Sequence, residues 1–177
     1  VQLHDLLPLA HDEETLAHVA ARVQQVQDAL GRQLVLENVS SYLRFAGDTL
    51  GEAEFLCALV EASGCGLLLD INNVYVNAHN HGIDAVAYLD ALPRHAVKQL
   101  HLAGHSEDAL GSGLLIDTHD APVCDGVWAL YTQAVRRFGE VPTMIERDDD
   151  IPLLQELLQE LDIARRIASD VRMELAA

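Results

Sequence analysis

An apolar run bounded by a glycine and an acidic residue lies near the middle of the chain and strongly constrains the fold. Gly66 is followed by Leu67, Leu68 and Leu69, and the run ends at Asp70. Three consecutive leucines in such a setting predict a short strand that is buried on both faces. Strands of this kind belong to parallel sheets covered by helices, which place their chemistry at the carboxyl ends of the strands. We therefore expect an α/β fold with Asp70 at a chemically important position.

The same pattern of an apolar run followed by a polar residue occurs three more times. Strands are expected at 33–37, 67–69, 97–102 and 142–146. Helices are expected from Asp12 to Leu30, from a capping box of Thr49 and Glu52 through Ser63, from Asp84 to Leu92, from Pro122 to Phe138, and from the segment 148–152 onward. The segment with His79 and His81 is expected to be rich in turns, and 103–119 to be a long loop. The chain thus repeats a βα unit four times.

Four parallel strands are too few to close a TIM barrel, which takes eight. Residues 1–177 are expected to form a single domain, either a small open α/β sheet or half of a barrel. The first residue is Val1 and not methionine, which favours a piece of a longer or processed chain. An open half-barrel has two unpaired edges, so we also expect association, for example as a homo-oligomer. Five leucines are expected to line the inside of the barrel: Leu34, Leu36, Leu67, Leu69 and Leu100.

Charge and cysteine content narrow the choice of partners and compartment. The chain has 28 acidic residues against 11 Lys and Arg, giving a formal net charge of −17. This excess argues against nucleic acid or an anionic membrane as a partner and favours bound cations. No apolar run is long enough to span a bilayer. Cys57, Cys65 and Cys124 are scattered along the chain. This predicts that they are reduced thiols in a cytoplasmic protein, and that they form neither a disulfide framework nor a zinc site with cysteine ligands.

Side chains that can bind metal recur at the predicted strand ends. Glu37, Asp70, His101 and Glu146 stand at or next to the ends of the four strands. A lone acid or histidine at such a place usually has a structural role, but the recurrence in successive units favours a shared site. Oxygen and nitrogen donors without thiolate indicate iron, manganese, magnesium or zinc, and several carboxylates indicate two or three ions. The remaining candidates are Asn73, His105, Asp117 and His119.

Five motifs carry a resemblance to a known family, and they occur in the expected order. They are Leu36-Glu37-Asn38-Val39-Ser40-Ser41-Tyr42, Asp70-Ile71-Asn72-Asn73-Val74-Tyr75, His101-Leu102-Ala103-Gly104-His105, Asp117-Thr118-His119 and Ile145-Glu146-Arg147-Asp148. The chain resembles the multinuclear non-haem iron oxidases typified by the oxidase of methanobactin biosynthesis. The resemblance implies a TIM barrel similar to xylose isomerase, of which this chain would supply strands five to eight.

The resemblance also implies a function and a distribution of ligands. Members of the family bind two or three irons and use dioxygen to modify cysteine residues of a ribosomally synthesised precursor peptide, usually with a partner protein that presents the peptide. By position, Glu37, Asp70, His101 and Glu146 would surround one or two irons, with Glu37 as a bridge. Asn73, His105, Asp117 and His119 would hold another. Two alternatives stay open: a divalent-metal sugar isomerase or hydrolase on the same kind of barrel, and a catalytically inactive metal-binding fragment.

Overall fold

A curved parallel sheet flanked by helices forms the body of the molecule in the computed structural model, which describes residues 8–177. The sheet has the strand order β1-β2-β3-β6, and each neighbouring pair is parallel. Its strands are β1 (Val35–Glu37), β2 (Gly66–Asp70), β3 (Val97–Leu102) and β6 (Thr143–Ile145). The α/β class with parallel βα units is confirmed, and the strands are ordered sequentially, as in one part of a TIM barrel.

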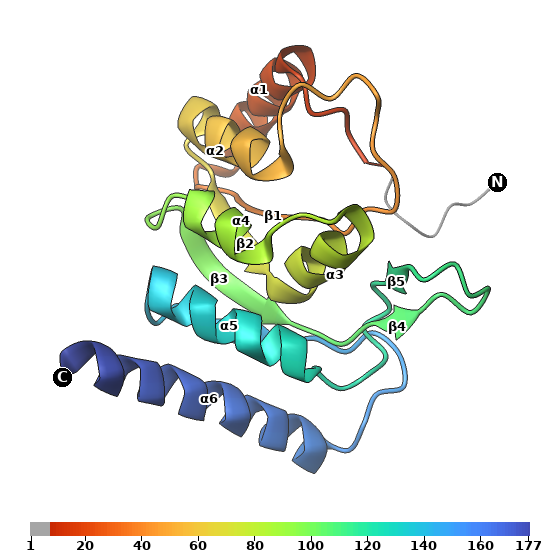
Figure 1. Cartoon of the computed structure of the whole chain (residues 1–177). Helices are drawn as coiled ribbons and strands as arrows, with labels where there is room; N and C mark the ends of the chain where they lie inside the picture. Colours follow the sequence, from red (N-terminus) through yellow and green to blue (C-terminus); the bar gives the residue numbers. More distant parts are fainter. Residues whose placement is uncertain (1–7) are drawn as a thin grey trace.

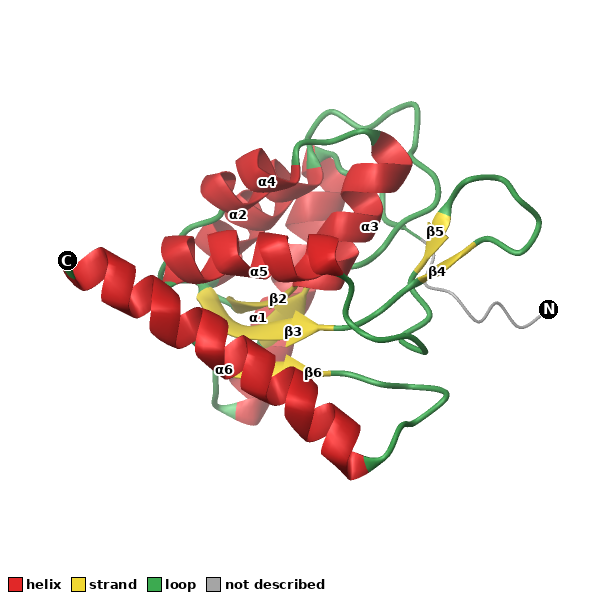
Figure 2. Ribbon diagram, turned by 60° about the horizontal axis from the view of Figure 1, so that its bottom comes forward, coloured by secondary structure: helices red, strands yellow, loops and turns green. Residues whose placement is uncertain are grey.

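Residues 8–177 contain six helices, which lie between and around these strands, with two of them, α3 and α4, between β2 and β3 (Figures 1 and 2). Their bounds are α1 (Glu13–Leu30), α2 (Glu52–Ser63), α3 (Ile71–His81), α4 (Ala85–Ala91), α5 (Asp125–Phe138) and α6 (Leu154–Ala176). In the long loop after β3, the short strands β4 (Ser106–Glu107) and β5 (Leu115–Ile116) form an antiparallel pair. Within residues 8–177, no helix is long and apolar enough to cross a membrane.

The prediction of a turn-rich segment around His79 and His81 was wrong, because α3 runs from the end of β2 to His81. Asparagines have low helix propensity, and their number in this segment masked the helix. Here they bond to neighbouring loops: Asn77 donates to the Val39 carbonyl and accepts from the Ser41 amide. Asn80 pairs in the same way with the Leu115 backbone. The helix therefore fixes two loops at the carboxyl side of the sheet.

Three helix starts also differ from those predicted. The N-cap of α2 is Gly51, whose amide donates to Glu54, so the capping box of Thr49 and Glu52 was wrong. Helix α5 begins at Asp125, after Pro122, and the amide of Val123 donates to a side chain of α6. Helix α6 begins at Leu154, because Asp150 adopts a left-handed φ of 44° that interrupts a helix. A hydrogen bond or a backbone angle that the sequence pattern does not reveal thus accompanies the start of each of these three helices.

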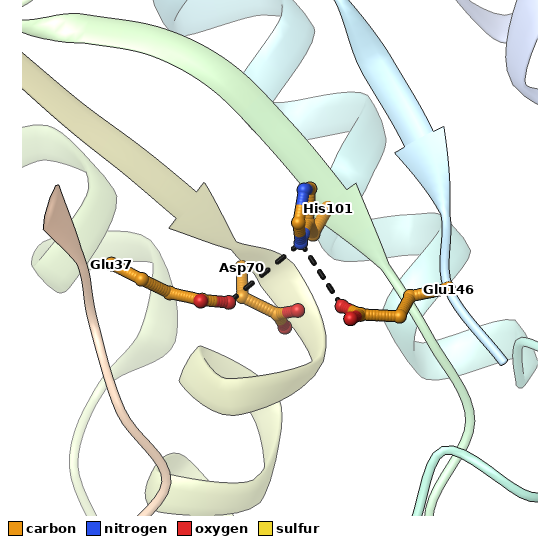
Figure 3. A group of neighbouring side chains, drawn as sticks. All are labelled: Glu37, Asp70, His101 and Glu146. Atoms are coloured by element: carbon orange, nitrogen blue, oxygen red, sulfur yellow. Dashed lines mark hydrogen bonds and ion pairs between the residues drawn. The ribbon is translucent and has the colours of Figure 1, made fainter. Parts of the chain in front are cut away.

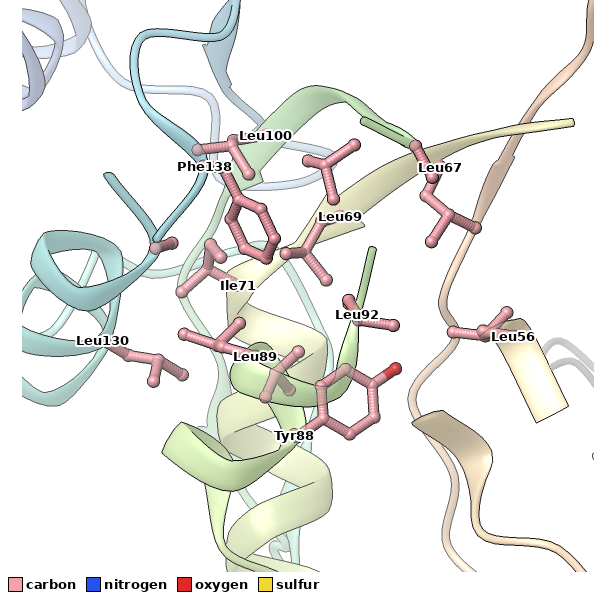
Figure 4. Packing of buried hydrophobic residues seen from close by; sticks show 14 of the residues in the cluster. Leu56, Leu67, Leu69, Ile71, Tyr88, Leu89, Leu92, Leu100, Leu130 and Phe138 are labelled. Carbon is pink, nitrogen blue, oxygen red and sulfur yellow. The ribbon is translucent and has the colours of Figure 1, made fainter. Parts of the chain in front are cut away.

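The main core lies between the sheet and the helices, and this location corrects the expected role of the leucines. Leu67, Leu69 and Leu100 are buried in a cluster with helix residues such as Leu89 and Phe138 (Figure 4). Leu34 and Leu36 pack against the same cluster and therefore also belong to the helix side. Alternate strand residues point the other way. Two of these, Val35 and Met144, are 40% exposed, so the inner face of the sheet is open.

A partly buried carboxyl group joins α2 to α3. Glu52 opens α2 and accepts a hydrogen bond of 3.2 Å from the side-chain amide of Asn77. Burial raises the pKa of Glu52 from 4.5 to about 7, although the hydrogen bond from Asn77 acts in the opposite direction. Because the folded state favours the protonated form, this group lowers stability progressively as the pH rises from about 4.5 to about 7.

Replacing Glu52 with glutamine should remove that titration while preserving the shape of the side chain. We expect the free energy of unfolding of E52Q, relative to the wild type, to increase between pH 4.5 and pH 7 by up to about 3 kcal/mol. Urea denaturation at a series of pH values measures this difference. Glu61→Gln, on the exposed side of α2, is the control. A wild-type and an E52Q profile that remain parallel would contradict the assigned pKa.

The two edge strands generate a second prediction. Within residues 8–177, β1 and β6 each pair with a single strand of the sheet, so each has one free edge. Unpaired edges with exposed apolar side chains such as Val35 and Met144 favour pairing with another chain. We expect the 177-residue chain to self-associate, with a sedimentation coefficient that increases with concentration in the micromolar range. A monomer at every concentration would refute the prediction.

Candidate metal centre

The four strand ends converge on one group of side chains, as Figure 3 shows. Asp70 and His101 are paired in register across β2 and β3, while Glu37 ends β1 and Glu146 directly follows β6. One potential ligand atom from each of the four lies within 4.8 Å of those of the others. His101 Nδ1 is 3.0 Å from Glu146 Oε2 and 3.7 Å from Glu37 Oε1. Carboxylates therefore lie on both sides of one imidazole.

Asp70 is the most completely enclosed member of this group, with no exposed surface. Its Oδ1 accepts a 2.7 Å hydrogen bond from the amide of Asn73 and thereby caps α3. The side-chain amide of Asn38 bonds to both the amide and the carbonyl of Asp70, which fixes the backbone beneath the carboxylate. Its Oδ2 is buried and has no hydrogen-bond partner. A buried carboxylate oxygen without a partner is costly unless a proton or a cation satisfies it.

A second group consists of His119, Glu146 and Asp148, and it shares Glu146 with the first. His119 Nδ1 is 3.2 Å from Asp148 Oδ2 and 3.7 Å from Glu146 Oε2. His119 has a φ of 51°, a left-handed conformation that is uncommon for residues other than glycine. Glu146 belongs to both groups, whereas the bridging role that the resemblance implies for Glu37 stays a prediction. Asp148 was not among the predicted ligands, although its position two residues after Glu146 was a usable signal.

The other predicted ligands lie around these two groups. Asp117 Oδ1 is 2.8 Å from His119 Nε2, in a geometry that is not a hydrogen bond. Asn73 donates from its side chain to the Asn38 carbonyl, and its buried Oδ1 has no partner.

His105 lies outside both groups and is held by two neighbours. Its Nδ1 is 2.7 Å from Asn72 Oδ1, and its ring stacks on Tyr75 at 5.2 Å between centroids. Asn72 in turn donates to Asp117 Oδ1 at 2.6 Å. The structure thus connects His105 to the site indirectly, through Asn72 and Asp117.

The convergence of carboxylates perturbs the titration of the site. Burial raises the pKa of Asp70 to about 7, and the nearby charges of Asp117 and Glu37 act in the same direction. Burial also raises the pKa of Glu37. For His119, burial lowers the pKa, but the carboxylates of Asp117, Asp70 and Glu146 outweigh it and raise the pKa to about 9. Without a metal, the carboxylates of the site therefore place negative charges close together, and bound protons neutralise part of that charge. A divalent cation would neutralise more of it.

The donor atoms fit a metal site built from oxygen and nitrogen. Iron, manganese, magnesium and zinc all accept carboxylate and imidazole ligands, whereas copper(I) and iron–sulfur clusters require soft sulfur. Cys57, Cys65 and Cys124 are free thiols, and within residues 8–177 none of them belongs to either group. Of the buried side-chain atoms without hydrogen-bond partners in residues 8–177, four lie at or beside these groups: Asp70 Oδ2, Asn73 Oδ1 and the two ring nitrogens of His119.

A family model described as the RiPP precursor modification enzyme MbnB/TglH/ChrH matches residues 1–169 of this chain. The chain belongs to this family. The match extends over all five motifs and over the elements that bring them together, from α1 to most of α6. Enzymes of this description modify ribosomally made peptide precursors, which agrees with the class of protein that the motifs indicated.

Relatives in several bacteria match nearly the whole chain. A UPF0276 protein of Caulobacter vibrioides is 57% identical over 175 residues, which is 98% of this chain and 61% of the relative. A protein of the same name from Anaeromyxobacter is 51% identical and one from Bordetella bronchiseptica is 50% identical, with 98% of this chain covered in both. These two matches cover 59% and 60% of the relatives. The chain therefore spans about three-fifths of the length of these family members.

Among solved structures, an L-ribulose 3-epimerase aligns with 98% of this chain and 57% of its own. The TM-score is 0.47 and the sequence identity is 21%.

The loop that carries His119 packs closely against the end of β3, and this contact generates a prediction. The amide of His119 donates to the Gly104 carbonyl, and a Cβ at Gly104 would lie 2.0 Å from the Ala121 carbonyl oxygen. Gly104→Ala should therefore displace the loop and destabilise the protein by about 1–3 kcal/mol, as overpacking does. Gly47→Ala is the matched control, since nothing lies within 4 Å of its added Cβ. Equal urea midpoints for both variants would contradict the close contact.

Proposed function

We propose that this chain forms the iron-binding part of a multinuclear non-haem iron oxidase that uses dioxygen to modify cysteine residues of a ribosomally synthesised peptide. Family membership supports the class of substrate. The observation that carries the metal assignment is the pair of ligand groups that share Glu146, together with the buried donor atoms that lack partners. Each of the two groups could hold one ion, and the proposal keeps the two or three irons that the family resemblance implies.

We assign the candidate ligands to two ions. Glu37, Asp70, His101 and Glu146 would hold one ion, and His119, Glu146 and Asp148 would hold a second. Asn73 and Asp117, which lie beside these groups, would complete the coordination. We place His105 one step away from the metal, where its contact with Asn72 orients Asp117.

Bound iron would supply dioxygen activation and an open coordination position for the thiolate of the substrate cysteine. The protein contributes the arrangement of its ligands and their charge. Gln99 lies 3.0 Å from His101 Nε2 and fixes the orientation of the ring, so that Nδ1 faces the carboxylates. The buried carboxylates attract a cation, and they stand at the carboxyl ends of the strands, where barrels of this kind bind their substrates.

The partners proposed for the intact enzyme follow from the same reasoning. A precursor peptide with cysteine is the substrate, and a further protein presents it. The excess of negative charge continues to argue against nucleic acid and anionic membranes. Three free cysteines support a reducing compartment, and we propose the cytoplasm.

Removing single ligands tests the metal assignment. We expect Asp70→Ala and His101→Ala to lower the iron content of anaerobically purified protein at least several-fold, because each removes a buried donor that no neighbour replaces. Metal analysis by mass spectrometry measures the content, and circular dichroism checks that the variants fold. Iron content at the wild-type level in both variants would refute the assigned ligands.

The control is a triple variant in which Cys57, Cys65 and Cys124 become serine. It should retain iron, because these thiols lie outside both ligand groups. Loss of iron in that variant would mean that a cysteine ligand had been missed. Wild-type protein that contains magnesium or manganese in place of iron would favour a divalent-metal isomerase or hydrolase, and protein without metal would favour an inactive fragment.

A further inference from the structure

A buried ion pair joins the segment that carries Glu146 and Asp148 to helix α6. Arg147 donates to Glu160 Oε2 at 2.8 Å, and the two side chains are only 5% and 14% exposed. Exposed ion pairs contribute little, but an enclosed pair fixes both partners in one geometry. Arg147 stands between the candidate ligands Glu146 and Asp148. The guanidinium therefore anchors the short segment that carries both ligands.

The same glutamate also holds the other loop of the site. Glu160 Oε1 accepts a 2.8 Å hydrogen bond from the amide of Val123, four residues after His119. The loops themselves are joined at the ligands, since the amide of Asp148 donates to the carbonyl of His119. Figure 1 shows the segments before α5 and before α6 at the same end of the molecule. One carboxylate on α6 thus uses both of its oxygens to bind two ligand-bearing segments.

We propose that Glu160 is a positioning residue that, through Arg147 and Val123, sets the distance between His119 and the carboxylates of Glu146 and Asp148. This inference rests on the metal site proposed above. Residues that orient metal ligands from behind influence affinity strongly although they do not contact the ion. His119 needs such support, because its left-handed backbone conformation persists only where the surroundings impose it. Without the Glu160 carboxylate, the contacts of His119 with Glu146 and Asp148 would still join the two loops, but no group behind the ligands would hold them together through Arg147 and Val123.

Glu160→Gln is the most conservative test. The amide preserves the volume of the side chain but has a single acceptor oxygen, so it can accept from the Arg147 guanidinium or from the Val123 amide and not from both. We expect E160Q to bind cobalt(II) at least about tenfold more weakly than the wild type, in the range seen for residues that support metal ligands. Anaerobic titration of the 177-residue chain with cobalt(II), followed by its visible absorption, reports both the affinity and the coordination geometry. The spectrum of E160Q should change as well, because a ligand moves.

Two further variants of α6 separate positioning from general stability. Val171→Ala removes buried apolar volume at 2% exposure, so it should lower the unfolding midpoint while leaving cobalt(II) affinity within about twofold of the wild type. Asp162→Asn disrupts an exposed pair with Arg165 and should change neither quantity. Weakening of cobalt(II) binding by V171A to the same extent as by E160Q would overturn the positioning role.

The outcomes also distinguish this inference from the function on which it rests. Wild-type affinity and spectrum in E160Q, with tight binding by the wild type, would overturn the role of Glu160 alone. A wild-type chain that binds no cobalt(II) would overturn the metal site itself, and the inference would fail with it. Weakened binding and an altered spectrum in E160Q, with V171A and D162N binding as the wild type does, would support both.

Discussion

The carboxylate of Asp70 joins the strand, the helix and the candidate metal site at one residue. One oxygen caps α3 through the amide of Asn73, and the other is buried without a partner among the remaining strand-end ligands. Asn38 bonds to the backbone of Asp70 with both atoms of its side-chain amide, as a neighbouring strand would. Because the position of α3 depends on this capping bond, the loops bound by Asn77 and Asn80 depend on it too.

This arrangement concentrates negative charge where water is scarce. Asp70 carries a pKa of about 7 because burial disfavours its charged form, and Glu37 is shifted in the same direction. The pKa of His119 also rises, to about 9, because the neighbouring carboxylates stabilise its protonated imidazolium form. Such a cluster of like charges lowers the stability of the folded protein, and a bound cation would restore that stability. The chain as a whole carries the same sign of charge, which raises the local concentration of cations.

The sequence predicted the parts of the site that follow from the periodicity of parallel strands. Apolar runs located the four strands, and their carboxyl ends placed Glu37, Asp70, His101 and Glu146 at one edge of the sheet. The orientation of the leucines was not predictable in the same way, because consecutive leucines give no alternation that distinguishes the two faces. Only the structure shows that Leu67 and Leu69 face the helices.

Other features escaped sequence reasoning because they depend on contacts between distant segments. Helix α3 forms against the propensity of its asparagines, whose side chains bond to loops more than 30 residues away along the chain. The position of Asp148 depends on a bond to the His119 carbonyl, and that of His105 on Asn72. Nothing in the local pattern around Glu160 distinguishes it from the other acidic residues of its helix, although it lies behind the site.

The unequal exposure of the ligands has a consequence for the rate at which the site could gain or lose an ion. Asp70 and His101 are buried, whereas the side chains of Glu37 and Asp148 are 40% and 66% exposed. If these residues hold an ion, water would replace a ligand first at the two exposed carboxylates. An arriving ion would meet these carboxylates before it reaches Asp70. Ion exchange at this site would then be stepwise, with a fast outer stage and a slow inner stage.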